Sequence, residues 1–398
     1  MRLRVDYTNH AIRFGQNYLY YADPSDTNPL GLPAYTIRLL YRNNFTPTFT
    51  KGTGVQLSTN PNVWDLTYNN SNWIDILHNH TNLLEVMGAN TSGVTGFSGA
   101  FAECTSLNKV ALFDTSSATN IEGMFSFCSN MTSYPLFDFS SARDARRLFY
   151  NNYALTTVPL FDFSSATQLD DMFVNCTSLV EVPLFDLSSA HYLSDMFMGC
   201  SGLTTIPLFD LSNAIKLTSF LSGCTSLTSV PAFDTHSATS LSYFFRGCRR
   251  LTSVPLLDTS SATNLRAMYQ GCTGLTSVPL NDTGSATQVN YMYAGCTRLT
   301  SIPLIDTSSA TNFEYMMQGC TALTSIPLFN TSSAVSVLYM CDGCTNVQSG
   351  ALALYQQMST QTTPPGSHSY CFTNCGSNTA SGQAELAQIP TSWGGTMA

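Results

Sequence analysis

The chain has 398 residues, of which 43% are hydrophobic and only 10% are charged, so it can bury a large core while its polar surface consists mainly of Ser, Thr and Asn. The net charge of −9 argues against a nucleic-acid partner, because proteins that neutralise phosphates need a basic surface. No apolar run approaches the length of a membrane span, and no apolar segment of a secretory signal follows Arg2 and Arg4. We therefore expect neither membrane insertion nor an export signal.

Residues 1–60 contain strand-like runs, such as residues 35–41, separated by turns rich in Pro, Gly and Asn. This pattern predicts a small β-rich N-terminal domain, which we interpret as an attachment domain. Residues 61–103 are predicted to form a divergent capping repeat, because His80, Leu83 and Val86 fall on positions of the repeat that follows.

Residues 104–350 repeat with a period of 24 residues, and a cysteine marks every unit except the one that has Asn152 instead. The cysteine row consists of Cys104, Cys128, Cys176, Cys200, Cys224, Cys248, Cys272, Cys296, Cys320 and Cys344. Stacked units bring such positions within disulfide or metal-binding reach. Core packing is the favoured interpretation, because a buried cysteine behaves as a small hydrophobe and Asn152 breaks any pairing scheme.

Each unit has two halves with different patterns. Residues 227–235 read L-x-x-V-P-A-x-x-T, and other units carry Leu where this one has Ala232, which matches the leucine-rich-repeat template L-x-x-L-x-L-x-x-N. We predict a short strand with alternating inward residues, although Pro231 cannot donate to a ladder. Ala238, Leu241 and Cys248 lie on one face of a predicted short helix that ends at a glycine.

Stacking such units buries one continuous core, because a single unit cannot cover its own apolar face. The predicted fold class is therefore an α/β repeat solenoid, leucine-rich-repeat-like, with 24-residue units of short strand, turn and short helix. After residue 350 the pattern breaks. Residues 351–358 look helical and precede Pro364, and residues 351–398 are predicted to form a C-terminal cap.

The unit L-T-S-V-P-L-x-D-T-S-S-A-T-N-L-x-x-M-F-x-G-C-T-S resembles the BspA-like leucine-rich repeat family, in particular its DUF285 branch, over residues 64–350. Members occur on the surfaces of gut and oral bacteria and protists, and in structural proteins of bacteriophages that infect gut Bacteroidales. The resemblance implies adhesion to a cell-surface glycan or protein. It transfers no catalytic or binding residue.

Two rows are candidates for binding. The first comprises Phe113, Phe137, Phe161, Phe185, Phe209 and Phe233, which form an aromatic platform if they face solvent and part of the core if they pack rung on rung. The second is the basic cluster of Arg246, Arg249 and Arg250. Its two interpretations are a binding site for an anionic glycan and a solvent-exposed face without a ligand. A similar cluster contains Arg143, Arg146 and Arg147.

Other polar groups have structural interpretations. An aspartate recurs ten residues after each cysteine position, from Asp114 to Asp306, and suits turn chemistry better than a calcium array. Cys341, Cys344, Cys371 and Cys375 have a spacing compatible with zinc, a disulfide or free thiols, of which free thiols are favoured. The histidines share no motif, and no nucleophile or phosphate-binding motif occurs.

These patterns predict a non-enzymatic adhesion or binding protein with no catalytic residue, cofactor or metal. Combined with the missing export signal, the family resemblance favours a bacteriophage virion protein of the tail or fibre. Its partners would be other virion proteins, bound through the N-terminal domain, and a bacterial cell-surface glycan or protein. A bacterial surface adhesin, located on the cell surface, and a purely structural virion protein are the alternatives.

Overall fold

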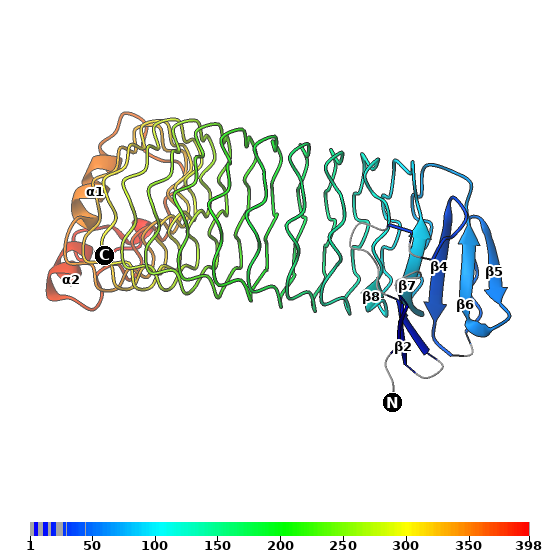
Figure 1. The fold of residues 1–398 in the computed structure, drawn as a ribbon. Helices are drawn as coiled ribbons and strands as arrows, with labels where there is room; N and C mark the ends of the chain where they lie inside the picture. Colours follow the sequence, from blue (N-terminus) through cyan, green and yellow to red (C-terminus); the bar gives the residue numbers. More distant parts are fainter. Residues whose placement is uncertain are drawn as a thin grey trace.

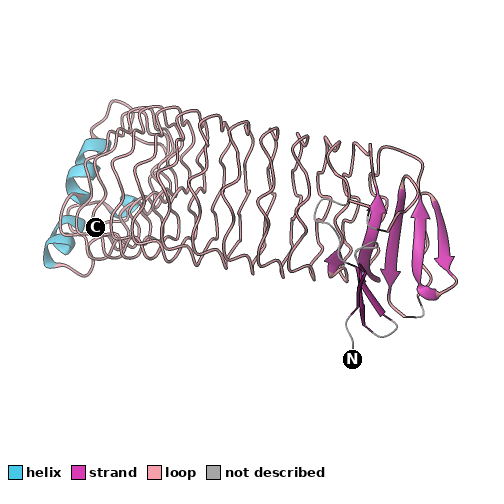
Figure 2. Ribbon diagram, in the orientation of Figure 1, coloured by secondary structure: helices cyan, strands magenta, loops and turns pink. Residues whose placement is uncertain are grey.

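The structure is a computed structural model that describes residues 4–6, 11–14, 17–20, 27–28, 30–43 and 45–397. It is a long solenoid with a β-sheet at its N-terminal end and helices at its C-terminal end (Figures 1 and 2). Strands β1 (Arg4–Asp6), β2 (Ala11–Phe14) and β3 (Asn17–Tyr20) form a separate antiparallel sheet.

A second sheet covers the first rungs of the solenoid. Its strands are β4 (Thr36–Tyr41), β5 (Thr53–Leu57), β6 (Asn60–Thr67), β7 (Leu83–Asn90) and β8 (Lys109–Val110), in the order β5-β6-β4-β7-β8. Strand β4 pairs antiparallel with both β6 and β7, whereas β7 and β8 pair in parallel as successive rungs do. The predicted boundary between residues 60 and 61 is therefore corrected: it falls inside β6, and one sheet joins the β-rich segment to the capping repeat.

The rungs stack with the predicted period. Parallel bridges connect residues 24 positions apart, beginning with Asn72 and Gly96 and continuing without a gap to Asn312 and Ser336. The next bridge joins Ser336 to Ser367, because the chain inserts α1 (Ala351–Ser359) before the last rung begins. The helix predicted at residues 351–358 is confirmed, and α2 (Ala380–Leu386) and the 3₁₀ helix η1 (Thr391–Trp393) follow it at the C-terminal end.

The short helix predicted in each unit is wrong. In residues 243–248 every second N–H donates to the next rung, as in Tyr243 to the carbonyl of Arg266 at 2.8 Å, and the N–H groups between them bond three residues back, as in Arg246 to Tyr243 at 3.0 Å. Tyr243 and Gly247 have positive φ values of 59° and 71°, which a right-handed helix excludes. The apolar spacing fits a series of overlapping turns as well as a helix, and the turns also bond neighbouring rungs.

The short strand predicted in each unit is also wrong between residues 111 and 350. Residues 228–233 make one backbone bond to the preceding rung, from the Thr228 N–H to Thr204 at 3.4 Å. The Phe233 N–H instead bonds within its own rung to the Pro231 carbonyl at 3.1 Å. This three-residue turn bends the chain and takes up the donor that a ladder would need.

One continuous core runs through the solenoid and includes the cysteine row, which the structure leaves as buried free thiols. Each thiol of this row, from Cys104 to Cys344, donates to a backbone carbonyl of the preceding rung, as in Cys200 Sγ to the Phe173 oxygen at 3.0 Å. The core-packing interpretation of the row is therefore confirmed.

Asn152 replaces a cysteine without losing that bond. Its amide Nδ2 donates to the Phe125 carbonyl at 2.9 Å, as a row thiol would, and its Oδ1 accepts from the Tyr134 hydroxyl at 3.1 Å. Tyr134 stands where other units carry Val or Ile. The buried Asn and its Tyr are thus a matched polar pair in an otherwise apolar position.

We predict that this pair is energetically coupled. Tyr134→Val should cost about 1–3 kcal/mol, because it leaves the buried Asn152 oxygen without a donor. Tyr134→Val combined with Asn152→Cys restores the pair found in other units and should cost less than the two single changes together, by about 1–2 kcal/mol. Urea unfolding followed by circular dichroism measures this, and strictly additive effects would contradict the pairing.

Candidate binding surface

The phenylalanine row proposed as a binding surface lies in the core. Exposed fractions are 1% for Phe113, Phe137, Phe161, Phe185 and Phe209, and 3% for Phe233. Within the row, ring centroids are 4.8 Å apart for Phe113 and Phe137 and 6.1 Å apart for Phe185 and Phe209. Phe161 and Phe233 pack on other core rings, those of Phe149 at 5.8 Å and Phe220 at 6.1 Å. The interpretation of these six residues as a solvent-facing platform is therefore wrong, and the core alternative is confirmed.

The leucine row immediately before it faces solvent instead. This row comprises Leu136, Leu160, Leu184, Leu208, Leu256, Leu280, Leu304 and Leu328, whose exposed fractions lie between 53% and 62%. The strand predicted from the leucine-rich-repeat template places these leucines inward. In most rungs a three-residue turn closes on the proline carbonyl, as in Phe209 N–H to Pro207 at 3.0 Å, and this turn reverses that assignment because it directs the central leucine outward and the residue after it inward.

The aspartate row acts as predicted, in turns. Asp162 Oδ1 accepts the Ser164 N–H at 2.9 Å and the Ser164 hydroxyl at 2.6 Å, and the same pair of bonds recurs at Asp114, Asp138, Asp186, Asp210 and Asp258. The Ser164 hydroxyl, followed by its N–H, lowers the pKa of Asp162. The row therefore carries exposed, ionised carboxylates that accept hydrogen bonds within their own turns.

Within the described part of the chain, no three His, Cys, Asp or Glu side chains gather as metal ligands would. Cys341, Cys344, Cys371 and Cys375 are buried free thiols. Among the same described residues, no helix has both the length and the apolar character needed to cross a membrane.

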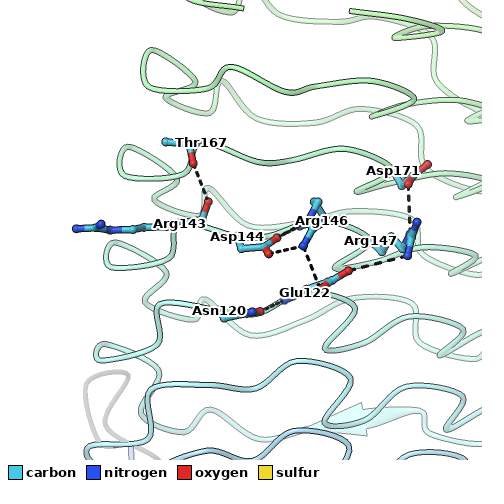
Figure 3. Close-up of polar contacts among 8 residues, drawn as sticks. All are labelled: Asn120, Glu122, Arg143, Asp144, Arg146, Arg147, Thr167 and Asp171. Atoms are coloured by element: carbon cyan, nitrogen blue, oxygen red, sulfur yellow. Dashed lines mark hydrogen bonds and ion pairs between the residues drawn. The ribbon is translucent and has the colours of Figure 1, made fainter. Parts of the chain in front are cut away.

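The arginine cluster at residues 143–147 is largely neutralised (Figure 3). Arg146 forms ion pairs with Asp144 at 2.7 Å and with Glu122 at 3.2 Å, and Arg147 pairs with Asp171 at 3.2 Å. Glu122 and Asp171 come from the preceding and following rungs, so the stacking brings each acid to its base.

The second arginine cluster, at residues 246–250, is not neutralised by carboxylates of the described residues. Among the described residues, no carboxylate lies within ion-pair distance of Arg246, Arg249, Arg250 or Arg266. Arg246 Nε donates to Gln270 Oε1 at 3.0 Å, which is a neutral partner. The cluster predicted at Arg246, Arg249 and Arg250 is therefore exposed and unpaired, and the structure adds Arg266 to it.

A tyrosine row, which the sequence reasoning missed, lies beside these arginines. Tyr291, Tyr315, Tyr339 and Tyr370 stack in succession, with ring centroids 4.6, 4.9 and 4.9 Å apart. Tyr243 belongs to the same row but is separated from Tyr291 by Ala267. The recurrence of Tyr at this one position of the 24-residue unit is the signal that could have revealed the row.

A shallow hollow of about 350 Å³ opens where the tyrosine row is interrupted. It is lined by Met198, Ser219, Ser222, Tyr243, Arg246, Arg266, Gln270 and Tyr291. A neighbouring hollow continues over Gly223, Gly247 and Gly271, with Arg249 at its side. Unpaired cations, aromatic rings and neutral hydrogen-bonding groups thus meet on one outer face.

These features define a repeat solenoid protein with repeating rows of side chains on its outer surface. The chain belongs to the family described as "Mycoplasma protein of unknown function, DUF285", which matches residues 73–182, 167–281 and 239–353. The matches overlap along the solenoid and confirm the predicted membership in the DUF285 branch of the BspA-like repeats.

Three solved structures are similar to this chain at low identity. A leucine-rich repeat protein from Eubacterium ventriosum is 17% identical over 68% of this chain and 77% of that one, with a TM-score of 0.42. The TLR13–ssRNA13 complex is 13% identical over 65% of this chain and 44% of that chain, with a TM-score of 0.19. The plant peptide hormone receptor RGFR1 in complex with RGF2 is 12% identical over 67% of this chain and 51% of that chain, with a TM-score of 0.21. None of the curated proteins compared with the chain matches it.

We predict that the solenoid loses stability in alkali. Burial raises the pKa of Cys104, Cys200 and Cys248 from 9.0 to about 12. The unfolded chain releases these protons near pH 8.5 and the folded chain does not, so stability is complete below that pH and falls between about pH 8.5 and 12. The urea midpoint measured from pH 7 to pH 10.5 should decrease steadily above pH 8.5. An unchanged midpoint would contradict the burial of the thiols.

Proposed function

We propose that this chain is a non-enzymatic binding protein that presents the outside of its solenoid to another macromolecule. The leucine row is the observation that carries the proposal. From Leu136 to Leu328, with Ala232 in place of one leucine, it extends over eight rung spacings, about 40 Å at ~4.8 Å per rung. Soluble proteins seldom expose so long an apolar row unless it contacts a partner.

The rest of the surface supports binding rather than catalysis. The aspartates are engaged in turns and the thiols are buried, so neither row supplies a reactive group. The unpaired arginines and the hollow beside them supply a second surface with polar specificity. A solenoid suits this arrangement, because each row repeats at a fixed spacing along a rigid axis.

As the setting of this function we propose a bacteriophage particle, in which the chain is a tail or fibre component. Its N-terminal segment would bind other virion proteins, and its solenoid would face a glycan or protein on the host cell. The occurrence of BspA-like repeats in phage structural proteins supports this setting. Their occurrence on bacterial surfaces supports the alternative of a cell-surface adhesin, and a purely structural virion protein is the third candidate.

Antibody labelling separates these settings. An antibody against the chain should decorate intact particles, at a site that contacts the host. Labelling of the bacterial envelope in the absence of particles would favour the adhesin, and particle labelling only after disruption would favour the structural component.

Binding of the fluorescently labelled full chain to a panel of gut Bacteroidales strains tests the function itself. We expect strain-selective binding that falls at least tenfold in Leu184→Glu/Leu208→Glu, because the change places charge in the apolar contact. Thr205→Glu/Ser229→Glu adds the same charge at exposed positions beside the row and should bind as the natural chain does.

Both double variants should have the same unfolding temperature as the natural chain, since the four side chains are exposed. Equal binding by the leucine variant would remove the leucine row from the interface. Absence of selective binding by the natural chain would contradict host-cell adhesion for that panel.

A further inference from the structure

The interruption of the tyrosine row creates a site with its own chemistry. Ala267 stands where a ring would complete the stack, so the facing sides of Tyr243 and Tyr291 are not covered by a tyrosine. The Arg266 guanidinium occupies this interval instead, 5.6 Å from each of the two ring centroids. Two cation–π contacts hold the planar fork in one orientation.

Arg266 is held but not neutralised. Among the described residues, its guanidinium has no carboxylate within ion-pair distance, and the hydrogen bonds of Arg266 are those of its backbone N–H to Asn264 and its backbone carbonyl from Tyr243. Arg246 lies 5.7 Å from the Tyr243 centroid on the same hollow. Two preorganised guanidinium groups that lack an anion favour a bound carboxylate, which an arginine fork binds with two parallel hydrogen bonds.

The rest of the lining is neutral. Ser219, Ser222 and Gln270 offer hydroxyl and amide groups, and no acidic side chain lines the hollow. Asp195 occupies the position equivalent to Ser219 in the preceding rung and lies outside this lining. A lining of aromatic rings and short polar groups around a cation suits a ring that carries several hydroxyls and one acidic group.

The positive charge is local. Within the same turn segments, Asp171 and Asp195 lie on the N-terminal side, and Glu314 and Asp342 lie on the C-terminal side. A long polyanion would meet these carboxylates as it left the hollow, whereas a compact anion would not. The volume of about 350 Å³ is at the lower end of ligand sites, which also favours a small ring over an extended peptide.

We propose that this hollow binds a carboxylated pyranose of a surface glycan, with Arg266 and Arg246 on the carboxylate and Gln270, Ser219 and Ser222 on the hydroxyls. This inference rests on the proposed binding function and assigns one of its ligands. Uronic acids and sialic acids share the required chemistry, as sulfated sugars do in part.

Titration calorimetry of the full chain with defined sugars tests the assignment. The probes are a tetrasaccharide of alternating glucuronic acid and N-acetylglucosamine, its carboxyl methyl ester, a sialylated trisaccharide and a 6-sulfated tetrasaccharide. We expect at least one carboxylated sugar to bind at least tenfold more tightly than the ester, and the comparison of the three acids identifies the source. Preference for the sulfated sugar over both carboxylated ones would overturn the carboxylate assignment.

The variants locate the site. Arg266→Ala should weaken binding at least tenfold, and Arg266→Lys should restore little of it, because a lysine keeps the charge but loses the planar fork. Ala267→Tyr should also abolish binding by completing the stack and displacing Arg266. Five other rungs already carry tyrosine at this position with φ between 53° and 59°, so the fold accommodates it. Arg298→Ala removes an exposed charge elsewhere and should bind normally.

Equal affinity in Arg266→Ala or Ala267→Tyr, both folded by circular dichroism, would overturn the site. Arginine-dependent binding of a tetra-glutamate peptide without binding of any sugar would overturn the ligand class. If selective binding to cells persists in Arg266→Ala while the sugars fail to bind, the proposed adhesion function stands and this inference falls.

Discussion

The hydrogen bonds that join successive rungs in the turn segment govern the rest of the structure. Every second N–H of this segment donates to a carbonyl of the next rung, as Tyr243 does to Arg266, and the N–H groups between them close turns within the rung. This register fixes the 24-residue period and the direction of each side chain. It also requires left-handed backbone at two positions in each rung, at a cost of about 1–2 kcal/mol for each non-glycine residue.

Because each residue lies beside the equivalent residue of the next rung, the solenoid arranges like with like. Rows of Phe and Cys fill the core, while rows of Leu, Asp and Tyr lie outside. Like neighbours suit apolar and aromatic groups, whose contacts improve with repetition. A row of charged groups is stable only where each charge has an opposite charge or a neutral hydrogen-bond donor beside it. Asp144 is such a partner for Arg146, and Ser164 is one for Asp162. An exception to a row therefore has a local cause, and Asn152 with Tyr134 is the clearest case.

The sequence predicted the period, the family, the buried cysteine row, the aspartate turns and the helix at residues 351–358. It did not predict the conformation of the unit, because apolar residues spaced like those from Leu241 to Cys248 suit a helix and a chain of turns equally well. Nor did it predict which of two adjacent rows faces solvent. Leu208 and Phe209 are both apolar, and the turn centred on Leu208 decides between them.

The candidate site was only half predictable. The Arg246 cluster stands out in a chain with few charges, but its difference from the Arg146 cluster depends on Asp144 within the rung and on residues one rung away. Glu122 lies 24 positions before Arg146 and pairs with it, whereas Ser222 occupies that place relative to Arg246. Once the register is known, comparing each residue with those 24 positions away recovers this distinction. The role of Arg266 between two rings required the structure, because it depends on the absence of a ring at Ala267.

The central claim is that the leucine row faces outward and the phenylalanine row inward, and thiol labelling tests it most directly. The thirteen natural cysteines are buried, so the folded chain should react little with a maleimide. Leu208→Cys should then gain one label within the first minutes under native conditions, and Phe209→Cys should gain its label only after denaturation. Rapid labelling at position 209 with protection at position 208 would show that the rows are reversed, and the account of the binding surface would fail with them.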